Sequence, residues 1–193
     1  EWGFRNSRVI WHGFDPTEFP PATYERGILS PLGPLVTSRP HYRGYFLYKQ
    51  VFDDFPLDLR PQSLQVPEPH VLYSGNTYAI AKFRNYVDAI RRHSIYFNPT
   101  QRSPMPRARC EPMMCGVVTV SAHNHDVDKF IQNGFNGFYA NDPGELRQIL
   151  IDLMRNPKAV TEIGAAARKT AIDIFNHDRY LSDWDKLISC MIG

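Results

Sequence analysis

The sequence predicts an α/β fold in which a parallel sheet is flanked by helices. From residue 76 onward, short apolar runs alternate with amphipathic segments. Residues 117–120 read V-V-T-V, which is typical of a buried strand, and Asp142-Pro143 is typical of a helix start. Strands that alternate with helices form parallel sheets covered on both faces. Ligands bind such sheets at the carboxyl ends of the strands.

The composition is that of a globular protein. The chain has 193 residues, of which 42% are apolar and 22% charged, so it is neither disordered nor composed of membrane spans. Its net charge of +2 is too small to predict binding to nucleic acid. Three cysteines, an odd number, indicate a reducing compartment, and we expect a cytoplasmic protein.

The first 75 residues are rich in proline and aromatic side chains and carry weak signals of regular structure. Candidate strands lie at residues 8–11, 32–38 and 71–73. A helix is expected over residues 45–55, where apolar side chains recur at helical spacing.

The rest of the chain gives clearer signals. Helices are expected at residues 78–93, 106–115 and 126–132, from 143, from 157 and at the C-terminus, with strands at 94–97, 117–120 and 137–140. The dinucleotide fingerprint Gly-x-Gly-x-x-Gly and the Walker phosphate loop do not occur in the sequence.

The segment 98–116 carries the residues that indicate chemistry. It joins a strand to a helix, and the N-terminus of a helix attracts anions. Arg107 and Arg109 add two positive charges there, and Glu111 lies one turn further on. A diphosphate held by the arginines and a ribose held by the carboxylate would explain this set. The alternative is that the arginines are solvated and that Glu111 pairs with one of them.

Residues 94–190 resemble the C-terminal half of a group-one, or family-four, glycosyltransferase with the GT-B fold. Residues 111–118 read E-P-M-M-C-G-V-V, where that family has E-A-M-A-x-G-x-P-V. Gly134–Phe138, Asp142–Leu146 and Asn156-Pro157 match its later motifs in order and in spacing. The resemblance implies a Rossmann-like domain that binds a nucleotide sugar.

The same resemblance implies the organisation of the chain. Residues 1–15 would connect to another domain, 16–75 would form a Pro-rich first part, and 76–193 a regular α/β part. Together they would make one domain. We expect the N-terminal acceptor domain of a complete enzyme to be absent from this chain, and the chain alone to be inactive.

Residues 35–44, L-V-T-S-R-P-H-Y-R-G, resemble a strand followed by an Arg and a Lys-Gly in the family. The resemblance implies that Arg39 and Arg43 hold the donor diphosphate, which suits the bidentate geometry of arginine. The alternative is two exposed loop arginines. Ser103 occupies the position, eight before Glu111, where the family has the first Glu of its Glu-x7-Glu motif near the donor sugar. This departure leaves the stereochemical outcome of the transfer open.

His123 and His125 follow the strand at 117–120 and are candidates for contacts to the donor. His123, His125 and Asp128 are close together in the sequence, as the ligands of a metal site are. The His-x-His-x-Asp-His pattern of binuclear metallohydrolases is not matched, however, because position 127 is Val and position 128 is Asp. We expect no metal at this loop, and a plain surface loop remains an alternative.

The expected function is therefore that of a glycosyltransferase donor domain. It would bind a nucleotide-diphosphate sugar, without a further cofactor, for transfer to an acceptor hydroxyl, with retention of configuration. A non-catalytic nucleotide- or sugar-binding module is the alternative, and a metal-dependent hydrolase is a weaker one. The expected partners are the nucleotide sugar, the missing N-terminal domain and, through that domain, a membrane.

Overall fold

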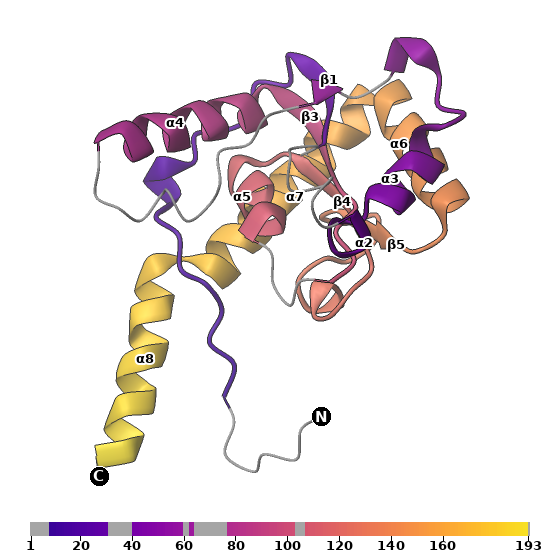
Figure 1. Ribbon diagram of the computed structural model, residues 1–193. Helices are drawn as coiled ribbons and strands as arrows, with labels where there is room; N and C mark the ends of the chain where they lie inside the picture. The colour runs from indigo at the N-terminus through magenta and orange to yellow at the C-terminus, as the bar shows by residue number, and fades with distance from the viewer. Residues whose placement is uncertain (1–7, 31–39, 60–61, 64–76, 103–106, 193) are drawn as a thin grey trace.

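A computed structural model describes residues 8–30, 40–59, 62–63, 77–102 and 107–192. At its centre lies a five-stranded sheet with the order β2-β1-β3-β4-β5, in which every neighbouring pair is parallel (Figure 1). The strands are β1 (Arg26–Ser30), β2 (Gln62–Ser63), β3 (His93–Asn98), β4 (Val118–Ala122) and β5 (Phe138–Ala140). The predicted parallel α/β fold is confirmed.

Helices cover both faces of this sheet. They are α2 (Pro40–Arg43), α3 (Tyr45–Phe52), α4 (Thr77–Arg91), α5 (Arg107–Cys115), α6 (Pro143–Arg155), α7 (Pro157–Phe175) and α8 (His177–Ile192). Helices α3 and α6 share one hydrophobic cluster with Ile95 and Phe97 of β3. Helices α4, α5 and α7 share the other with Tyr96. Strand β3 contributes to both because successive side chains of a strand point to opposite faces.

Helices α6 and α7 begin where the sequence predicts. The side chain of Asp142 accepts a hydrogen bond of 2.7 Å from the backbone N–H of Glu145. Asn156 accepts one of 3.1 Å from the backbone of Ala159 in the same way. A proline follows each cap at the first helical positions, where its missing N–H is not needed.

The first part of the chain differs from the prediction. Residues 8–11 are not a strand, and the strand β1 at residues 26–30 was not predicted. Its sequence, R-G-I-L-S, is short and does not alternate between apolar and polar residues. The expected helix is confirmed but ends at Phe52. The candidate strands at 32–38 and 71–73 lie outside the described residues.

The helix expected over residues 126–132 is also wrong. A single 3-10 turn, η4 (Val127–Lys129), stands in its place. The side-chain amide of Asn136 donates to the carbonyl oxygen of Phe130, and its oxygen accepts from the N–H of Gln132. The side chain of Asn136 thus satisfies the backbone C=O of Phe130 and the backbone N–H of Gln132, which a further helical turn would otherwise have paired.

The last helix, α8, extends away from the sheet (Figure 1). At its root, the N–H of Phe14 donates to the carbonyl oxygen of Phe175 at 2.7 Å. The guanidinium of Arg179 donates to the backbone oxygens of Trp11 and His12, at 2.7 and 3.1 Å. We call residues 8–14 the N-terminal strap. The strap and α8 are therefore tied together at the end of α7.

Helix α8 carries an exposed apolar stripe. Its members are Leu181, Trp184, Ile188 and Met191. Among the described residues, no helix is long and apolar enough to span a bilayer.

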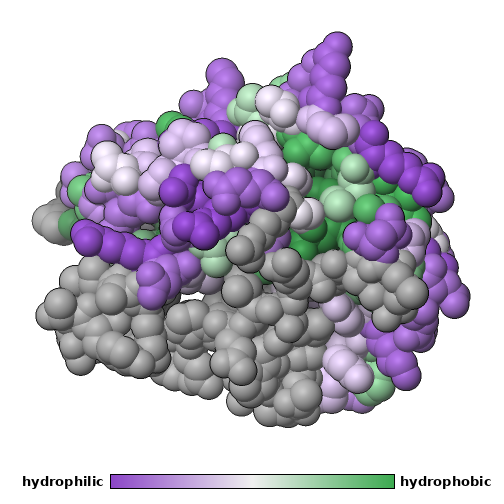
Figure 2. All heavy atoms as spheres, turned by 90° about the horizontal axis from the view of Figure 1, so that it is seen from above, coloured by the Kyte–Doolittle hydropathy of each residue, from purple (hydrophilic) through white to green (hydrophobic). Residues whose placement is uncertain are grey.

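Figure 2 shows the molecule from above, where hydrophobic side chains gather on the right of the view.

Gly44 joins α2 to α3 against the end of β3. Its φ of 78° lies in the left-handed region, and a Cβ at this position would lie 1.7 Å from the carbonyl oxygen of Pro99. No side chain fits there, so this glycine allows α2 and α3 to approach the carboxyl end of the sheet.

We predict that Gly44→Ala lowers the free energy of unfolding by more than about 2 kcal/mol, because it adds a backbone clash to a strained φ. Gly134→Ala is the matched control, since Gly134 has a φ of 80° but nothing within 4 Å of the added Cβ. It should lose only about 1–2 kcal/mol, the cost of the left-handed conformation. Urea unfolding measures both, and equal losses would contradict the steric role of Gly44.

Candidate functional site

The carboxyl end of the sheet contains the point where the strand order reverses. From β1 the chain reaches β2 on one side and then β3 on the other. In open α/β sheets, the crevice between two such strands is the usual ligand site. Strand β1 ends at Ser30, whose hydroxyl donates to the carbonyl oxygen of Phe97 at 3.0 Å. Helix α5 begins near this edge and carries three of the predicted site residues.

Glu111 is buried at the centre of a polar cluster, with 4% of the residue exposed. The Tyr86 hydroxyl donates to its Oε2 at 2.8 Å, from helix α4. Arg107, one turn earlier on α5, forms an ion pair from Nε to Oε1 at 3.4 Å. The carboxylate is therefore held from two helices at once.

The electrostatics of this cluster are those of a buried charge. Burial raises the pKa of the Glu111 carboxyl, while the charge of Arg107 and the hydrogen bond from Tyr86 oppose that rise. Burial also raises the pKa of Tyr86 and of Tyr96, so both hydroxyls are neutral near physiological pH. The Tyr86 hydroxyl donates to Glu111, while that of Tyr96 forms no hydrogen bond within the described part of the chain. Arg43 lies near enough to lower the pKa of Tyr96 against the effect of burial. The structure thus pairs Arg107 with Glu111, and it places Tyr96 near both Glu111 and Arg43.

Arg107 has a second contact. Its guanidinium carbon lies 4.9 Å from the centre of the Phe14 ring, in the N-terminal strap. A guanidinium over an aromatic face is attracted by the negative charge density of the ring. The cluster around Glu111 therefore touches the strap as well as α4 and α5.

Arg109 faces the opposite way, into the loops that follow β3 and β4. It is 1% exposed, and it donates to Asn124 Oδ1 at 2.6 Å and to the backbone oxygen of Thr100 at 2.9 Å. A longer bond of 3.4 Å reaches the backbone oxygen of Ala122. Burial lowers the pKa of Arg109 to about 10, so it stays charged at neutral pH. Its contacts join the ends of two strands.

Arg43 is half-buried at the end of α2. Its Nε atom is buried and forms no hydrogen bond within the described part of the chain. Arg39 and Ser103, the two other residues expected near the donor, lie outside the described residues.

His123 and His125 lie in the loop after β4, and both are exposed. The His123 ring stacks on that of Tyr139, with ring centres 4.9 Å apart. His125 adopts a left-handed φ of 45°. Among the residues that the structure describes, no group of three or more His, Cys, Asp or Glu side chains gathers as a metal site would require.

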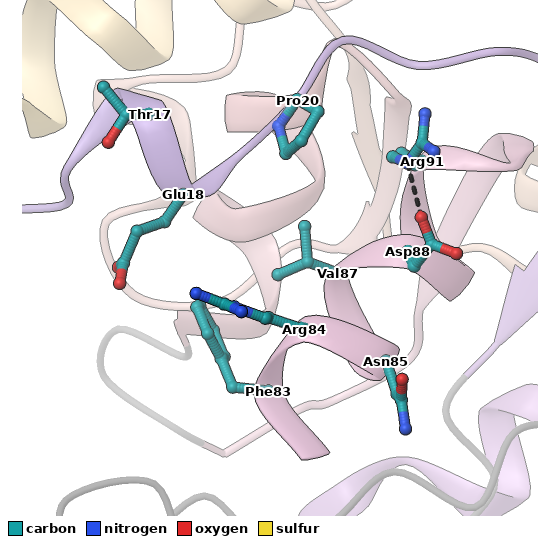
Figure 3. Close-up of a pocket in the computed structure, with 9 residues that line it drawn as sticks. All are labelled: Thr17, Glu18, Pro20, Phe83, Arg84, Asn85, Val87, Asp88 and Arg91. Atoms are coloured by element: carbon teal, nitrogen blue, oxygen red, sulfur yellow. Dashed lines mark hydrogen bonds and ion pairs between the residues drawn. The ribbon is translucent and has the colours of Figure 1, made fainter. Parts of the chain in front are cut away.

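A separate open groove of about 460 Å³ lies between residues 17–20 and the outer side of α4 (Figure 3). Phe83 and Val87 line it, together with Arg91, which pairs with Asp88 at 2.6 Å. Of the predicted site residues that the structure describes, none lines this groove. It is distinct from the cluster around Glu111.

Several residues of the site were not found from the sequence. Tyr86 and Tyr96 read as ordinary core positions of a helix and a strand, and only their contacts reveal the link to Glu111. Thr100 and Asn124 read as loop residues, although Arg109 binds both. The tyrosines carry one usable signal, because a buried tyrosine hydroxyl needs a polar partner.

Comparison with known families identifies the fold. A family model described as glycosyl transferase-like matches residues 69–184, more than half of the chain. The chain belongs to this glycosyl transferase-like family. The resemblance found in the sequence is therefore confirmed. No curated protein matches the chain in sequence.

Solved structures agree with this assignment at the level of the fold. A glycosyltransferase from Rickettsia africae matches the domain with a TM-score of 0.74 and 14% identity, covering 96% of this chain and 57% of that one. Anabaena HepE, solved with UDP and glucose, matches with a TM-score of 0.68 and 15% identity, covering 94% and 56%. The chain thus spans little more than half of their length.

A third structure is itself a single domain. It is the C-terminal domain of a group 1 glycosyl transferase, LpcC, from Francisella tularensis. The TM-score is 0.61 at 11% identity, and the match covers 85% of this chain and 99% of that one. The glycosyltransferase-like domain therefore has the fold of the C-terminal half of group-one GT-B enzymes.

We predict that Arg109→Lys lowers the free energy of unfolding by about 2–3 kcal/mol, because one ammonium group cannot satisfy the acceptors of a buried guanidinium. Arg155→Lys, at an exposed position of α6, is the matched control and should change stability by less than about 0.5 kcal/mol. Urea unfolding measures both variants. A neutral Arg109→Lys would contradict the structural role of this side chain.

Proposed function

We propose that this domain binds the nucleotide-diphosphate sugar donor of a glycosyltransferase. The observation that carries the proposal is the buried carboxylate of Glu111, which is paired with Arg107 on the helix that begins near the carboxyl edge of the sheet. A carboxylate with unused lone pairs binds vicinal hydroxyls, and arginines bind phosphates. Ribose and diphosphate occur together in a nucleotide sugar.

Each residue has a proposed role. Glu111 accepts hydrogen bonds from the ribose hydroxyls. Arg43, with its buried and unbonded Nε, and Arg107 hold the diphosphate, and Arg39 joins them. His123 is exposed, and its ring stacks on that of Tyr139. From this position in the loop after β4, it contacts the donor. Arg109 supports the site by holding the loops in which Thr100 and Asn124 lie.

The proposed reaction is glycosyl transfer to an acceptor hydroxyl. As the bond to the sugar breaks, negative charge develops on the departing diphosphate. Fixed cations at that position stabilise the transition state more than the ground state. The resemblance to group-one enzymes implies retention of the configuration of the anomeric carbon, whereas Ser103, in place of the first motif Glu, is a departure from the family at this point.

The complete enzyme is proposed to contain an N-terminal half that supplies the acceptor site and any membrane contact. The chain spans 57% of the Rickettsia glycosyltransferase, which leaves room for such a half. The exposed stripe on α8 supports this proposal, because contiguous apolar surface is usually covered in an assembly. The strap and α8 are the two segments that would meet the other half.

We predict that the chain binds UDP, since HepE was solved with it, and that Glu111→Gln weakens binding about tenfold by removing a charged acceptor. Isothermal calorimetry with UDP, GDP, ADP and dTDP measures affinity and base preference. Glu162→Gln, at an exposed glutamate of α7, is the matched control. Binding of no diphosphate, or unchanged binding by Glu111→Gln, would contradict the donor site.

We further predict that the isolated chain does not transfer sugar, and that fusion to an N-terminal half restores transfer. In the fusion, Glu111→Gln should reduce the rate. A radiolabelled donor assay measures all three proteins. Transfer by the isolated chain would overturn the first expectation. A fusion that binds donor but never transfers would instead favour a non-catalytic binding module.

A further inference from the structure

Tyr86 is a buried group that the proposed function does not use. It lies on α4, is 7% exposed, and directs its hydroxyl to Oε2 of Glu111 at 2.8 Å. Twenty-five residues separate the two in the sequence, so the contact is tertiary and not a local pairing within one helix. A hydroxyl directed at a buried carboxylate forms a charge-assisted hydrogen bond, which is stronger than a neutral one.

The geometry leaves part of the carboxylate unused. An ionised carboxylate has about four acceptor sites. Tyr86 occupies one on Oε2, and Arg107 approaches Oε1 at 3.4 Å. Two rigid helices thus hold the two oxygens, and the remaining lone pairs have a fixed direction. Fixed orientation of this kind is what a binding group needs before its ligand arrives.

We propose that Tyr86 is a positioning residue for Glu111, holding the carboxylate in the orientation in which its free lone pairs accept the ribose hydroxyls of a bound nucleotide. This inference rests on the proposed donor site. It adds a residue from α4, outside the segment in which the sequence signals for that site lie.

Tyr96 supports the same arrangement from the sheet. Its hydroxyl is buried beside that of Tyr86, and the charge of Glu111 raises its pKa together with burial. Within the described part of the chain, the other titratable groups near Glu111 are Arg107, Cys110 and Cys115 of α5, and Arg43 of α2 lies near Tyr96. Burial keeps the Cys110 thiol protonated. Among these groups, Arg107 is therefore the cation that pairs with Glu111, and Tyr86 donates a hydrogen bond to the Glu111 carboxylate.

The sign of the pH effect follows from these contacts. The hydrogen bond from Tyr86 favours the ionised form and lowers the pKa of Glu111, while burial raises it. Tyr86→Phe removes the first effect and keeps the second, so the pKa rises further. Only the carboxylate accepts two hydroxyl groups well. Binding should therefore begin to weaken at a higher pH in the variant when the solution is acidified.

The experiment measures UDP affinity by calorimetry from mildly acidic to mildly alkaline pH. We expect Tyr86→Phe to bind about tenfold more weakly at neutral pH, with its loss of affinity on acidification displaced to higher pH. Glu111→Gln provides the background curve, since it reports the titration of UDP itself. Tyr24→Phe is the matched control, because it removes a hydroxyl bonded at 2.9 Å to the Gly116 carbonyl oxygen.

A second measurement does not depend on the ligand. Carbon NMR of the glutamate side-chain carboxyls follows the titration of Glu111, assigned by its loss in Glu111→Gln. Tyr86→Phe should raise this pKa, and Tyr24→Phe should leave it unchanged. A merely structural role for Tyr86 would lower the thermal stability of the variant without moving either curve.

The outcomes separate the two proposals. If wild-type protein fails to bind UDP and the other diphosphates, the donor site is overturned and the positioning role with it. If the wild type binds UDP, and Tyr86→Phe has the same affinity and pH profile, the positioning role alone is overturned. A displaced profile in Tyr86→Phe, absent in Tyr24→Phe, supports it.

Discussion

The carboxyl edge of the sheet depends on one buried cation. Arg109 is enclosed by protein, and a buried guanidinium is tolerated only when its donors find acceptors. Thr100, Ala122 and Asn124 supply acceptors to its two terminal nitrogens, whereas its Nε has no hydrogen-bond partner among the described residues. The three acceptor residues lie at or beyond the ends of β3 and β4. These bonds join both loops to the first turn of α5, the helix that also carries Glu111.

The sequence predicted the C-terminal half of the fold better than the first part because its signals are local. Asp142 and Asn156 cap helices through their own side chains, so each start can be read from a few residues. Strand β1 is different, since it forms by pairing with β3, far away in the chain. The turn at Val127 is set by Asn136, which no helical periodicity reveals.

In the candidate site, too, contacts within one helix could be read from the sequence, and contacts between distant segments could not. From the sequence, pairing of Glu111 with one of the two arginines was the alternative to a diphosphate and ribose site, and the structure shows such a pair with Arg107, at i and i+4 on one helix face. Whether an arginine faces solvent or the interior depends on its neighbours, and the sequence did not distinguish Arg107 from Arg109. Tyr86 lies on a different helix, and its role emerges only when α4 packs against α5.

The joint between the N-terminal strap and α8 has a mechanical consequence. Arg179 binds the strap at the root of a helix of 16 residues, which is about 24 Å long. The base of this helix lies next to the backbone hydrogen bond between Phe14 and Phe175, so a change in the tilt of the helix would take place about that point. A tilt of about 10° at that point would carry its far end about 4 Å. Displacement of α8 would therefore act on the strap, whose Phe14 ring lies 4.9 Å from the guanidinium carbon of Arg107.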